Sequence, residues 1–305
     1  MRAWRRERRQ DAFAPKALAL LAALVWLGGC HEQPDPRFQA PLVSGVITLP
    51  MTATQRFEER LSATGFVAAL RGGENAGITF STIAAAADDG DGAASADIVL
   101  AQLAAASFDP RIMGPGVAPV DALTGSGQTL VLGSGFVSVF DPVSPLGLLQ
   151  VQGEVLSEIT PHGYTRVLGV RDGGERDVAI VGRNDYHQGM FESAIQVGPG
   201  IVEGGLLDIS PRERKLPTFV RAFVASCSDR WIVGVTQIPM HLIDVGERLL
   251  AFFAAEELAC DEVVNLSGDR EALLAVMSED RRSIAYFGNP ALPRASLLAF
   301  AASTP

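Results

Sequence analysis

Residues 221–236 read RAFVASCSDRWIVGVT, and this stretch decides the fold class. Two runs rich in Val, Ile and Ala flank the polar turn Ser228-Asp229-Arg230, which is the pattern of two β-strands separated by a turn. The same alternation of short apolar runs with Gly, Pro and Asp turns extends over the chain from Leu123 onward. The sequence therefore predicts a mixed α+β fold with a mostly antiparallel sheet and few helices, not a regular βαβ series.

Working outward from this stretch, ten segments have the length and composition of strands. They are Thr129–Leu132, Phe136–Phe140, Leu146–Val151, Arg166–Val170, Val178–Val181, Ser193–Val197, Arg221–Ala225, Trp231–Thr236, Val263–Leu266 and Ala272–Met277. A long helix is predicted at His241–Leu258, because its apolar residues recur on one face and Pro239 lies just before it. Two shorter helices are predicted at Arg56–Leu70 and Ala96–Ala106.

The first thirty residues have the order of regions that is typical of a secretion signal. A basic segment is followed by the apolar run Ala17–Leu27, which is too short for the roughly 20 residues of a membrane-spanning helix. The run ends at Leu-Gly-Gly followed by Cys30, which resembles the lipobox of bacterial lipoproteins. We expect cleavage before Cys30 and acylation of its thiol, which would anchor the protein in a membrane. An ordinary signal peptide with a chance cysteine and an uncleaved anchor helix are the two alternatives.

These features divide the chain into four parts. They are a signal peptide at 1–29, a Pro-rich tether at 30–50, an N-terminal helical and loop part at 51–118, and the main domain at 119–305. By analogy with lipoproteins, His31 after the cysteine favours the outer membrane over the inner one. The expected location is therefore the cell envelope, on the side that faces the periplasm.

Charge and cysteine content narrow the classes of partner. Cleavage would remove six basic and two acidic residues, so the formal net charge of −10 becomes −14 and Lys215 is the only lysine left. So acidic a surface argues against nucleic-acid binding and against electrostatic attachment to anionic lipid. Apart from Cys30, the cysteines are Cys227 and Cys260, which either form a disulfide in an oxidising compartment or remain buried thiols.

Standard catalytic and metal-binding motifs are absent from the sequence. It has no Gly-x-Ser-x-Gly, no His-Glu-x-x-His and no phosphate-binding Gly-rich loop. The four histidines are far apart, and the acidic run Asp88–Asp91 has no Glu at the position that an EF-hand requires. We therefore expect no metal site and no cofactor, and we interpret the acidic run as a solvated loop.

A series of short segments in a fixed order points to a family. They are Gly133-Ser134-Gly135-Phe136, Pro145-Leu146-Gly147-Leu148, Gln196-Val197-Gly198-Pro199, the strand that Arg221 begins, and Asn265-Leu266-Ser267-Gly268 after the helix that ends near Cys260. This order resembles the phosphodiester glycosidase family, whose best-known member removes N-acetylglucosamine to uncover mannose 6-phosphate. The resemblance covers about half of the chain, residues 120–277, and implies the fold of that family.

The resemblance also implies which residues would form a site. The positions that match the family motifs, and would bind substrate, are Ser134, Gly135, Gln196, Gly198, Ser267 and Gly268. Arg221 would bind the phosphate, because a guanidinium donates two parallel hydrogen bonds to phosphate oxygens. The alternatives are an ion pair at a strand end for Arg221, a structural amide for Gln196, and a simple turn at Gly198.

The departures from the family pattern affect catalysis more than binding. The family's Asn falls on Gly133, its Asp on Ser267, and its Thr or Asn after the Arg on Ala222. A carboxylate near the anomeric carbon would then have to come from Asp269 or Glu271. Glu271 would share a face with Ser267 and Asp269 if the strand continued through it.

The sequence thus predicts an envelope lipoprotein whose domain binds, and with a rearranged site hydrolyses, sugar-phosphate diesters in glycans or glycolipids. The alternatives are a non-catalytic glycan-binding or assembly lipoprotein and a structural lipoprotein that docks a partner. The expected partners are the membrane, through acylated Cys30, and a glycan or glycolipid phosphodiester.

Overall fold

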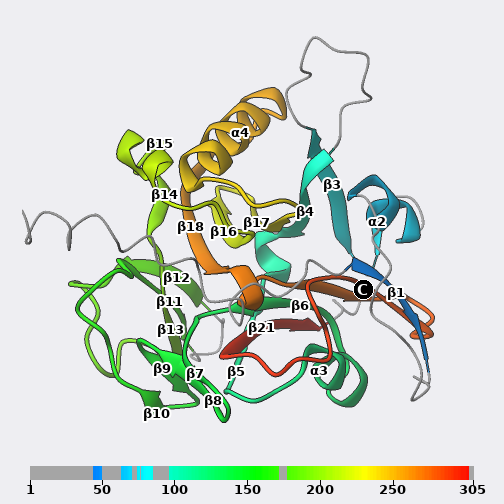
Figure 1. Ribbon diagram of the computed structural model, residues 1–305, viewed down its shortest axis with the longest axis horizontal. Coiled ribbons are helices and arrows are strands. Elements are labelled where there is room, and N and C mark those ends of the chain that lie inside the picture. The colour runs from blue at the N-terminus through cyan, green and yellow to red at the C-terminus, as the bar shows by residue number, and fades with distance from the viewer. Residues whose placement is uncertain are drawn as a thin grey trace, which may run out of the picture. The chain divides into compact units, whose positions relative to one another are not determined.

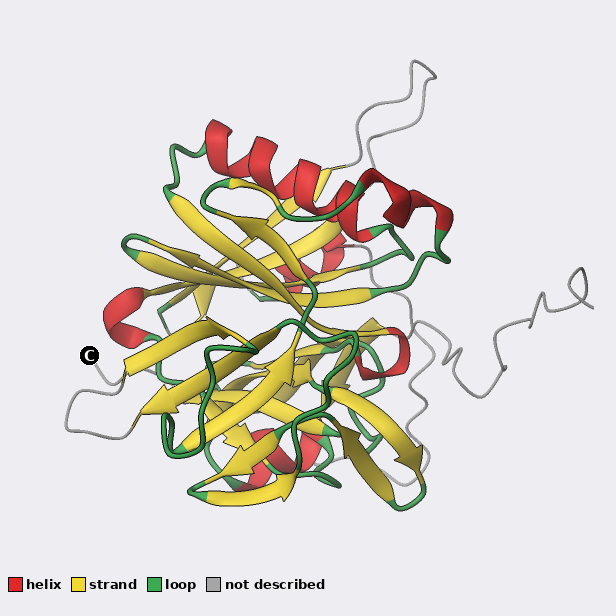
Figure 2. Cartoon of the chain, turned by 90° about the vertical axis from the view of Figure 1, so that its left-hand side faces the viewer, coloured by secondary structure: helices red, strands yellow, loops and turns green. Residues whose placement is uncertain are grey.

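A computed structural model describes residues 44–49, 63–70, 74–75, 77–84, 96–171 and 177–301. The predicted signal peptide, Cys30 and the acidic run at 88–91 lie outside these residues. The described chain belongs to one compact unit that spans residues 40–305. The described residues form three α-helices, and every strand pairing among them is antiparallel. The predicted sheet-rich, mostly antiparallel architecture is confirmed (Figure 2).

The largest sheet has eight strands and contains the stretch from which the fold was predicted. Its order is β15 (Leu206–Leu207), β14 (Gly200–Glu203), β18 (Cys260–Gly268), β16 (Arg221–Cys227), β17 (Arg230–Thr236), β4 (Ala96–Ala104), β3 (Ile78–Ala84) and β2 (Glu74–Asn75). Successive residues of β16 face opposite sides: Val224 belongs to one core, and Phe223 and Ala225 to another. The central strands are therefore apolar on both faces.

Two further sheets and a two-stranded ribbon complete the unit (Figure 1). The six-stranded sheet has the order β1 (Ser44–Thr48), β20 (Ser283–Phe287), β19 (Leu274–Met277), β6 (Gln128–Ser134), β21 (Ser296–Ala301) and β5 (Arg111–Met113). The five-stranded sheet has the order β10 (Glu154–Ser157), β9 (Leu149–Val151), β13 (Ser193–Val197), β11 (Arg166–Arg171) and β12 (Asp177–Gly182). The ribbon pairs β7 (Phe136–Phe140) with β8 (Val143–Leu146).

Helices cover the sheets at the edges of the unit (Figure 1). The longest, α4 (Leu242–Ala255), packs Val245, Leu249 and Phe253 on the β14–β18 side of the large sheet. The other two are α2 (Ala63–Ala69), within the predicted Arg56–Leu70 helix, and α3 (Pro119–Gly125) against β6. Short 3-10 turns are η1 (Ala105–Ser107), η2 (Pro211–Lys215) and η3 (Asp269–Glu271). No helix in the described ranges is long and apolar enough to cross a membrane.

One predicted element has the wrong type. The helix expected at Ala96–Ala106 is instead β4, which pairs with β3 on one side and β17 on the other. Its residues alternate between two cores, with Ile98 and Leu100 facing one and Val99, Ala101 and Leu103 the other. Its alanines favour a helix, but packing on both faces of the sheet outweighs that preference.

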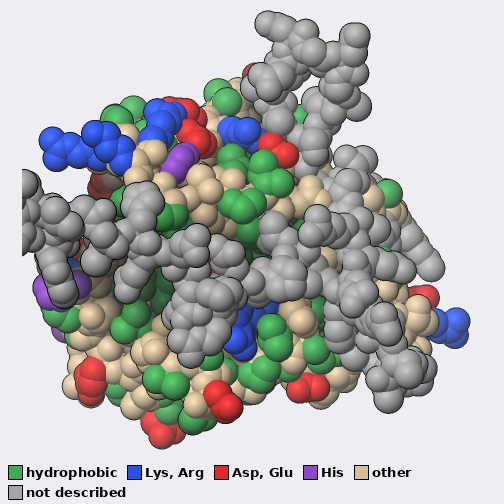
Figure 3. All heavy atoms as spheres, viewed as in Figure 1, with side chains coloured by type: hydrophobic (Ala, Val, Ile, Leu, Met, Phe, Trp, Pro, Cys, Tyr) green, Lys and Arg blue, Asp and Glu red, His purple; other side chains and the backbone are tan. Residues whose placement is uncertain are grey.

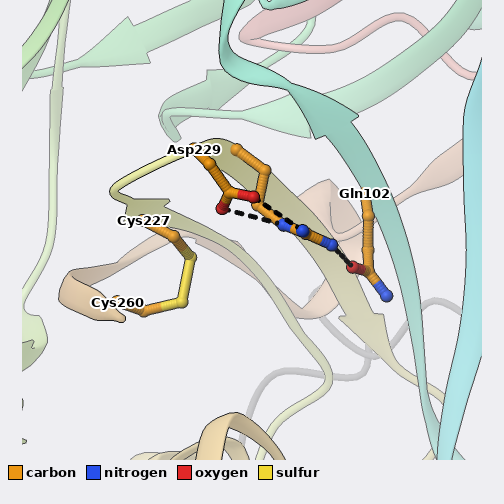
Figure 4. The surroundings of a disulfide bond; sticks show 5 residues. Gln102, Cys227, Asp229 and Cys260 are labelled. Carbon is orange, nitrogen blue, oxygen red and sulfur yellow. Dashed lines mark hydrogen bonds and ion pairs between the residues drawn. A yellow bond between two sulfur atoms is a disulfide. The ribbon is translucent and has the colours of Figure 1, made fainter. Parts of the chain in front are cut away.

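Cys227 and Cys260 form a disulfide, which settles the alternative left open by the sequence. The bond joins the end of β16 to the beginning of β18, 33 residues later (Figure 4). Beside it, the Arg230 guanidinium donates to both Asp229 carboxylate oxygens, at 3.0 and 2.7 Å, and to Gln102 Oε1 at 3.2 Å. The turn between β16 and β17 is thus fixed to both β18 and β4.

Candidate functional site

Arg221 lies where β16 begins, beside the end of β18. Its backbone N–H donates to Thr236 Oγ1 at 2.9 Å, and it pairs with Gly268. Its guanidinium carbon lies 4.9 Å from the centre of the Phe219 ring, in cation–π contact. A Cβ at position 268 would lie 3.0 Å from Arg221 Nη1. A glycine at position 268 therefore leaves room for the guanidinium.

The charge of Arg221 has no direct partner within the described part of the chain. Its buried Nε makes no hydrogen bond, and no carboxylate there lies within ion-pair distance of the guanidinium. Burial lowers the pKa of Arg221 to about 10, and the nearby Glu213 and Asp269 carboxylates partly oppose this effect. The ion-pair alternative for Arg221 is not what the structure shows. Among the described residues, the mostly buried Arg221 guanidinium is therefore left without a direct counter-charge.

Glu213 does not neutralise Arg221, because its carboxylate is held elsewhere. One oxygen accepts the Leu242 N–H at 2.9 Å and the other accepts the Ile243 N–H at 3.3 Å. These N–H groups belong to the first turn of α4, where a carboxylate is stabilised by the helix dipole. Glu213 thus anchors η2 to α4 and contributes only a longer-range field at Arg221.

Asp269 is the carboxylate that the structure brings to the Arg221 side. It follows β18 directly, and its N–H donates to the Val220 carbonyl at 2.8 Å. Its φ is 54°, in the left-handed region that non-glycine residues rarely occupy and that is frequent at functional sites. Burial raises the pKa of Asp269, and the positive charge of Arg221 partly counteracts this. Arg221 and Asp269 therefore form a half-buried pair of opposite charges without a direct ion pair.

Glu271, the other predicted carboxylate, does not share this face. The strand ends at Gly268 and the chain turns through η3, so the condition for Glu271 to point like Ser267 is not met. Its carboxylate accepts the Ala295 N–H at 2.9 Å, and its second oxygen is buried without a hydrogen bond. Burial raises the pKa of Glu271, although the positive charge of Arg294 favours ionisation. Glu271 belongs to the protein interior.

The structure brings the predicted substrate-binding segments together through backbone hydrogen bonds. The Gly135 N–H donates to the Leu266 carbonyl at 3.0 Å, and the Gly198 N–H donates to the Asn265 carbonyl at 2.8 Å. Asn265 Nδ2 returns a bond to the Gly198 carbonyl at 3.0 Å. Two segments that lie far from β18 in the sequence, one of them 67 residues away and the other farther, thus meet at its end.

The polar side chains of Ser134, Gln196 and Ser267 form hydrogen bonds to other groups of the protein. Ser267 Oγ donates to the Gly133 carbonyl at 2.9 Å, and Ser134 Oγ donates to Ser296 Oγ at 3.3 Å; both serines are fully buried. The Gln196 amide makes four hydrogen bonds: it accepts the N–H groups of Leu148 and Thr160 and donates to the carbonyls of Thr160 and Tyr164. An amide has no further capacity, so Gln196 is the structural amide that the sequence left as an alternative.

The backbone explains why Gly133 cannot be the family's asparagine. A Cβ at position 133 would lie 1.9 Å from the Glu271 carbonyl oxygen, far inside van der Waals contact. The Gly133 N–H also donates to the Leu273 carbonyl at 2.9 Å. The chain after η3 therefore occupies the space that a side chain at position 133 would need. A glycine at position 133 and the turn at Asp269–Glu271 therefore depend on each other.

Three residues near the site were not predicted from sequence. Phe219 supports Arg221, Glu213 adds a negative charge, and fully buried Arg294 donates to the carbonyls of Arg270 and Asn289 at 2.6 and 2.7 Å. The sequence did contain a signal for Phe219, because an aromatic residue two positions before the Arg that begins a strand can stack on its guanidinium. The residue type alone does not mark Arg294 as buried, because its partners are backbone carbonyls, one of them 24 residues away. No cluster of three or more metal-ligand side chains occurs within the described ranges.

Comparison with known proteins supports the fold. No protein-family model matches the sequence, and a search of curated proteins finds no match. The structure is similar to the zebrafish N-acetylglucosamine-1-phosphodiester alpha-N-acetylglucosaminidase catalytic domain auto-inhibited by pro-peptide, with a TM-score of 0.50 and 12% identity over 85% of this chain and 88% of that one. The fold is similar to that of a phosphodiester glycosidase.

A hypothetical protein from Synechocystis also aligns, with a TM-score of 0.43 and 11% identity over 82% of this chain and 69% of that one. At such identities the comparison concerns the fold, and the activity has to be argued from the site.

Proposed function

We propose that this chain is an envelope lipoprotein whose domain binds a sugar-phosphate diester at Arg221 with little or no turnover. The observation that carries the proposal is the mostly buried guanidinium without a direct ion pair, placed where the motif segments meet. A phosphodiester carries one negative charge and two free oxygens, which a guanidinium can bind through two parallel hydrogen bonds.

Weak or absent turnover follows from what the site lacks. The position of the family's asparagine is filled by backbone, and Ser267, at the family's aspartate, is buried and donates to a carbonyl. Cleavage of a glycosyl phosphate needs a group that stabilises positive charge at the anomeric carbon, and neither position supplies one. Removal of one such group commonly costs several orders of magnitude in rate.

Asp269 supports a second candidate, an active hydrolase. Its half-buried carboxylate, raised pKa and left-handed backbone conformation are compatible with a catalytic acid. The two candidates differ only in whether the bound diester is cleaved, so one set of variants separates them.

The test uses the mature domain and the methyl phosphodiester of N-acetylglucosamine 1-phosphate. We expect calorimetry to detect binding that falls at least tenfold in Arg221→Ala, since a hydrogen bond to a charged group contributes about 1.5–3 kcal/mol. Arg282→Ala, which removes an exposed arginine, is the matched control and should bind as the native protein does. Unchanged binding in Arg221→Ala at an unchanged unfolding midpoint would refute the proposal.

Release of free sugar is measured on the same samples. Native protein that releases sugar, with the release lost in both Arg221→Ala and Asp269→Asn, would show that Asp269 provides the carboxylate and that the chain is a hydrolase. Our expectation is that no release above the uncatalysed rate is seen, and that Asp269→Asn still binds the diester.

A further inference from the structure

A cavity lies away from Arg221, between the segment that follows β10 and the loop that follows β12. Its volume is about 510 Å³, within the range of small-molecule sites. Leu148, Val155 and the Tyr186 ring provide apolar surface, and Glu158, Asn184 and His187 are among its polar lining residues. It shares no lining residue with the Arg221–Asp269 pair.

The walls of this cavity are fixed by buried hydrogen bonds. Gln196 bonds to the backbones of Leu148 and Thr160, which both line the cavity, so its amide joins two of the walls. Tyr186 Oη donates to Gln150 Oε1 at 2.9 Å, and Gln150 Nε2 donates to the Phe191 carbonyl at 2.8 Å. The Tyr186 ring therefore has a fixed orientation, and little ordering remains to be done on binding.

A third wall contact joins the two loops directly. Arg183 Nη1 donates to the Pro161 carbonyl, across the cavity mouth from one lining segment to the other. Arg183 and Glu158 are the only lining residues with a permanent charge at neutral pH, and their charges are opposite. The cavity thus has no excess charge of either sign, which favours a neutral ligand over a phosphate.

We propose that this cavity binds a neutral sugar ring of a glycan. A pyranose has an apolar C–H face and an edge of hydroxyl groups, so it needs a ring or aliphatic surface on one side and side-chain donors and acceptors around it. The Tyr186 ring with Leu148 and Val155 supplies the first, and Asn184, His187 and Glu158 supply the second. The motif residue Gln196 is then a positioning residue for the glycan cavity.

This inference goes beyond the phosphodiester proposal, because it needs neither Arg221 nor Asp269. It places a second recognition site at the five-stranded sheet, beside the segments that follow β10 and β12. A glycan that carries a phosphodiester at one sugar and a neutral ring elsewhere would have two independent sets of contacts.

The experiment is saturation-transfer difference NMR on the mature domain with the methyl glycosides of glucose, galactose, mannose and N-acetylglucosamine. We expect transfer to at least one glycoside, reduced at least fivefold in the double variant Asn184→Ala with His187→Ala. Both residues are exposed, so the variant should keep the native unfolding midpoint. Glu154→Ala, an exposed β10 residue outside the cavity lining, is the control and should retain the signal.

Three results would overturn the proposal. One is no transfer to any of the four glycosides, and another is an undiminished signal in the double variant. The third is loss of the signal in Arg221→Ala, which would place the sugar at the phosphodiester site instead. Because phosphodiester binding is measured separately by calorimetry, failure of one proposal leaves the other standing.

Discussion

At the scale of single residues, Arg221, Gly133 and Glu271 show how one turn determines which side chains lie at the candidate site. The 3-10 turn after Gly268 places the Glu271 carbonyl against Gly133 and sends the Glu271 side chain into the interior. The same turn leaves Asp269 beside Arg221. A cation and one carboxylate remain on the side where the motif segments meet, while the other motif side chains serve the scaffold.

This arrangement predicts that an asparagine, the residue of the phosphodiester glycosidase motif, will not be tolerated at position 133. Gly133→Asn should destabilise the domain by at least about 2 kcal/mol, because its Cβ cannot fit beside the Glu271 carbonyl without a backbone shift. The measurement is urea unfolding followed by circular dichroism. Gly153→Asn is the control, since a Cβ there has open space and Asn tolerates a positive φ. Equal midpoints for the two variants would contradict the packing argument.

At the scale of elements, the large sheet depends on strands far apart in sequence being held in register. The Cys227–Cys260 disulfide makes a covalent loop of the segment that contains β17 and α4. A cross-link across 33 residues reduces the entropy of the unfolded chain, which corresponds to roughly 2–4 kcal/mol of stability.

We therefore expect the double variant Cys227→Ser with Cys260→Ser to unfold at a lower urea concentration, with a loss of about 2–4 kcal/mol. Addition of reductant should destabilise the native domain similarly and leave the double variant unchanged. A native domain indifferent to reductant under unfolding conditions would show that the thiols are not bonded in the purified protein.

Sequence predicted the elements whose pattern is local. β7 (Phe136–Phe140) and β13 (Ser193–Val197) have the predicted bounds, and α4 begins and ends within a few residues of its prediction. The helix predicted at Ala96–Ala106, where the structure has β4, was wrong. Alanines and a continuous apolar run fit a helix as well as they fit a strand that is buried on both faces. Its true neighbours, β3 and β17, are set by long-range pairing that no local window contains.

The site was predictable only in part, for the same reason. Motif order correctly indicated which segments meet, because each one lies where a strand begins or ends, and these strands belong to the three sheets and the ribbon. Side-chain roles were not predictable, since whether Gln196 or Ser267 faces a ligand or the backbone depends on loops packed against them. The turn at Asp269–Glu271 did have a local signal, because the dipeptide Ser267-Gly268, which is typical of turns, directly precedes it.

At the scale of the whole molecule, the question is how an acidic domain is held at its place of action. The sequence carries a formal net charge of −10, and on the face shown in Figure 3 basic side chains gather beside α4 and are few elsewhere. Arg214 forms ion pairs with Asp244 and Glu247 of α4, so its positive charge is neutralised by carboxylates of the same domain. We therefore expect the domain's surface charge to attach it only weakly to anionic lipid, so that membrane attachment would require the proposed acyl anchor at Cys30.

The corresponding prediction is that the thiol of Cys30, and not the domain, holds the protein at the membrane. Cys30→Ser should abolish incorporation of a labelled fatty acid and move the protein from the membrane pellet to the soluble fraction, because each buried methylene of an acyl chain contributes about 0.8 kcal/mol to membrane binding. Cys227→Ser with Cys260→Ser is the control, since both thiols belong to the domain and their loss should leave labelling intact. A Cys30→Ser protein that remains in the pellet after a high-salt wash, and still incorporates label, would show that the apolar run at 17–27 is an uncleaved anchor and that acylation occurs elsewhere. Release without any labelling of the native protein would instead point to an ordinary signal peptide.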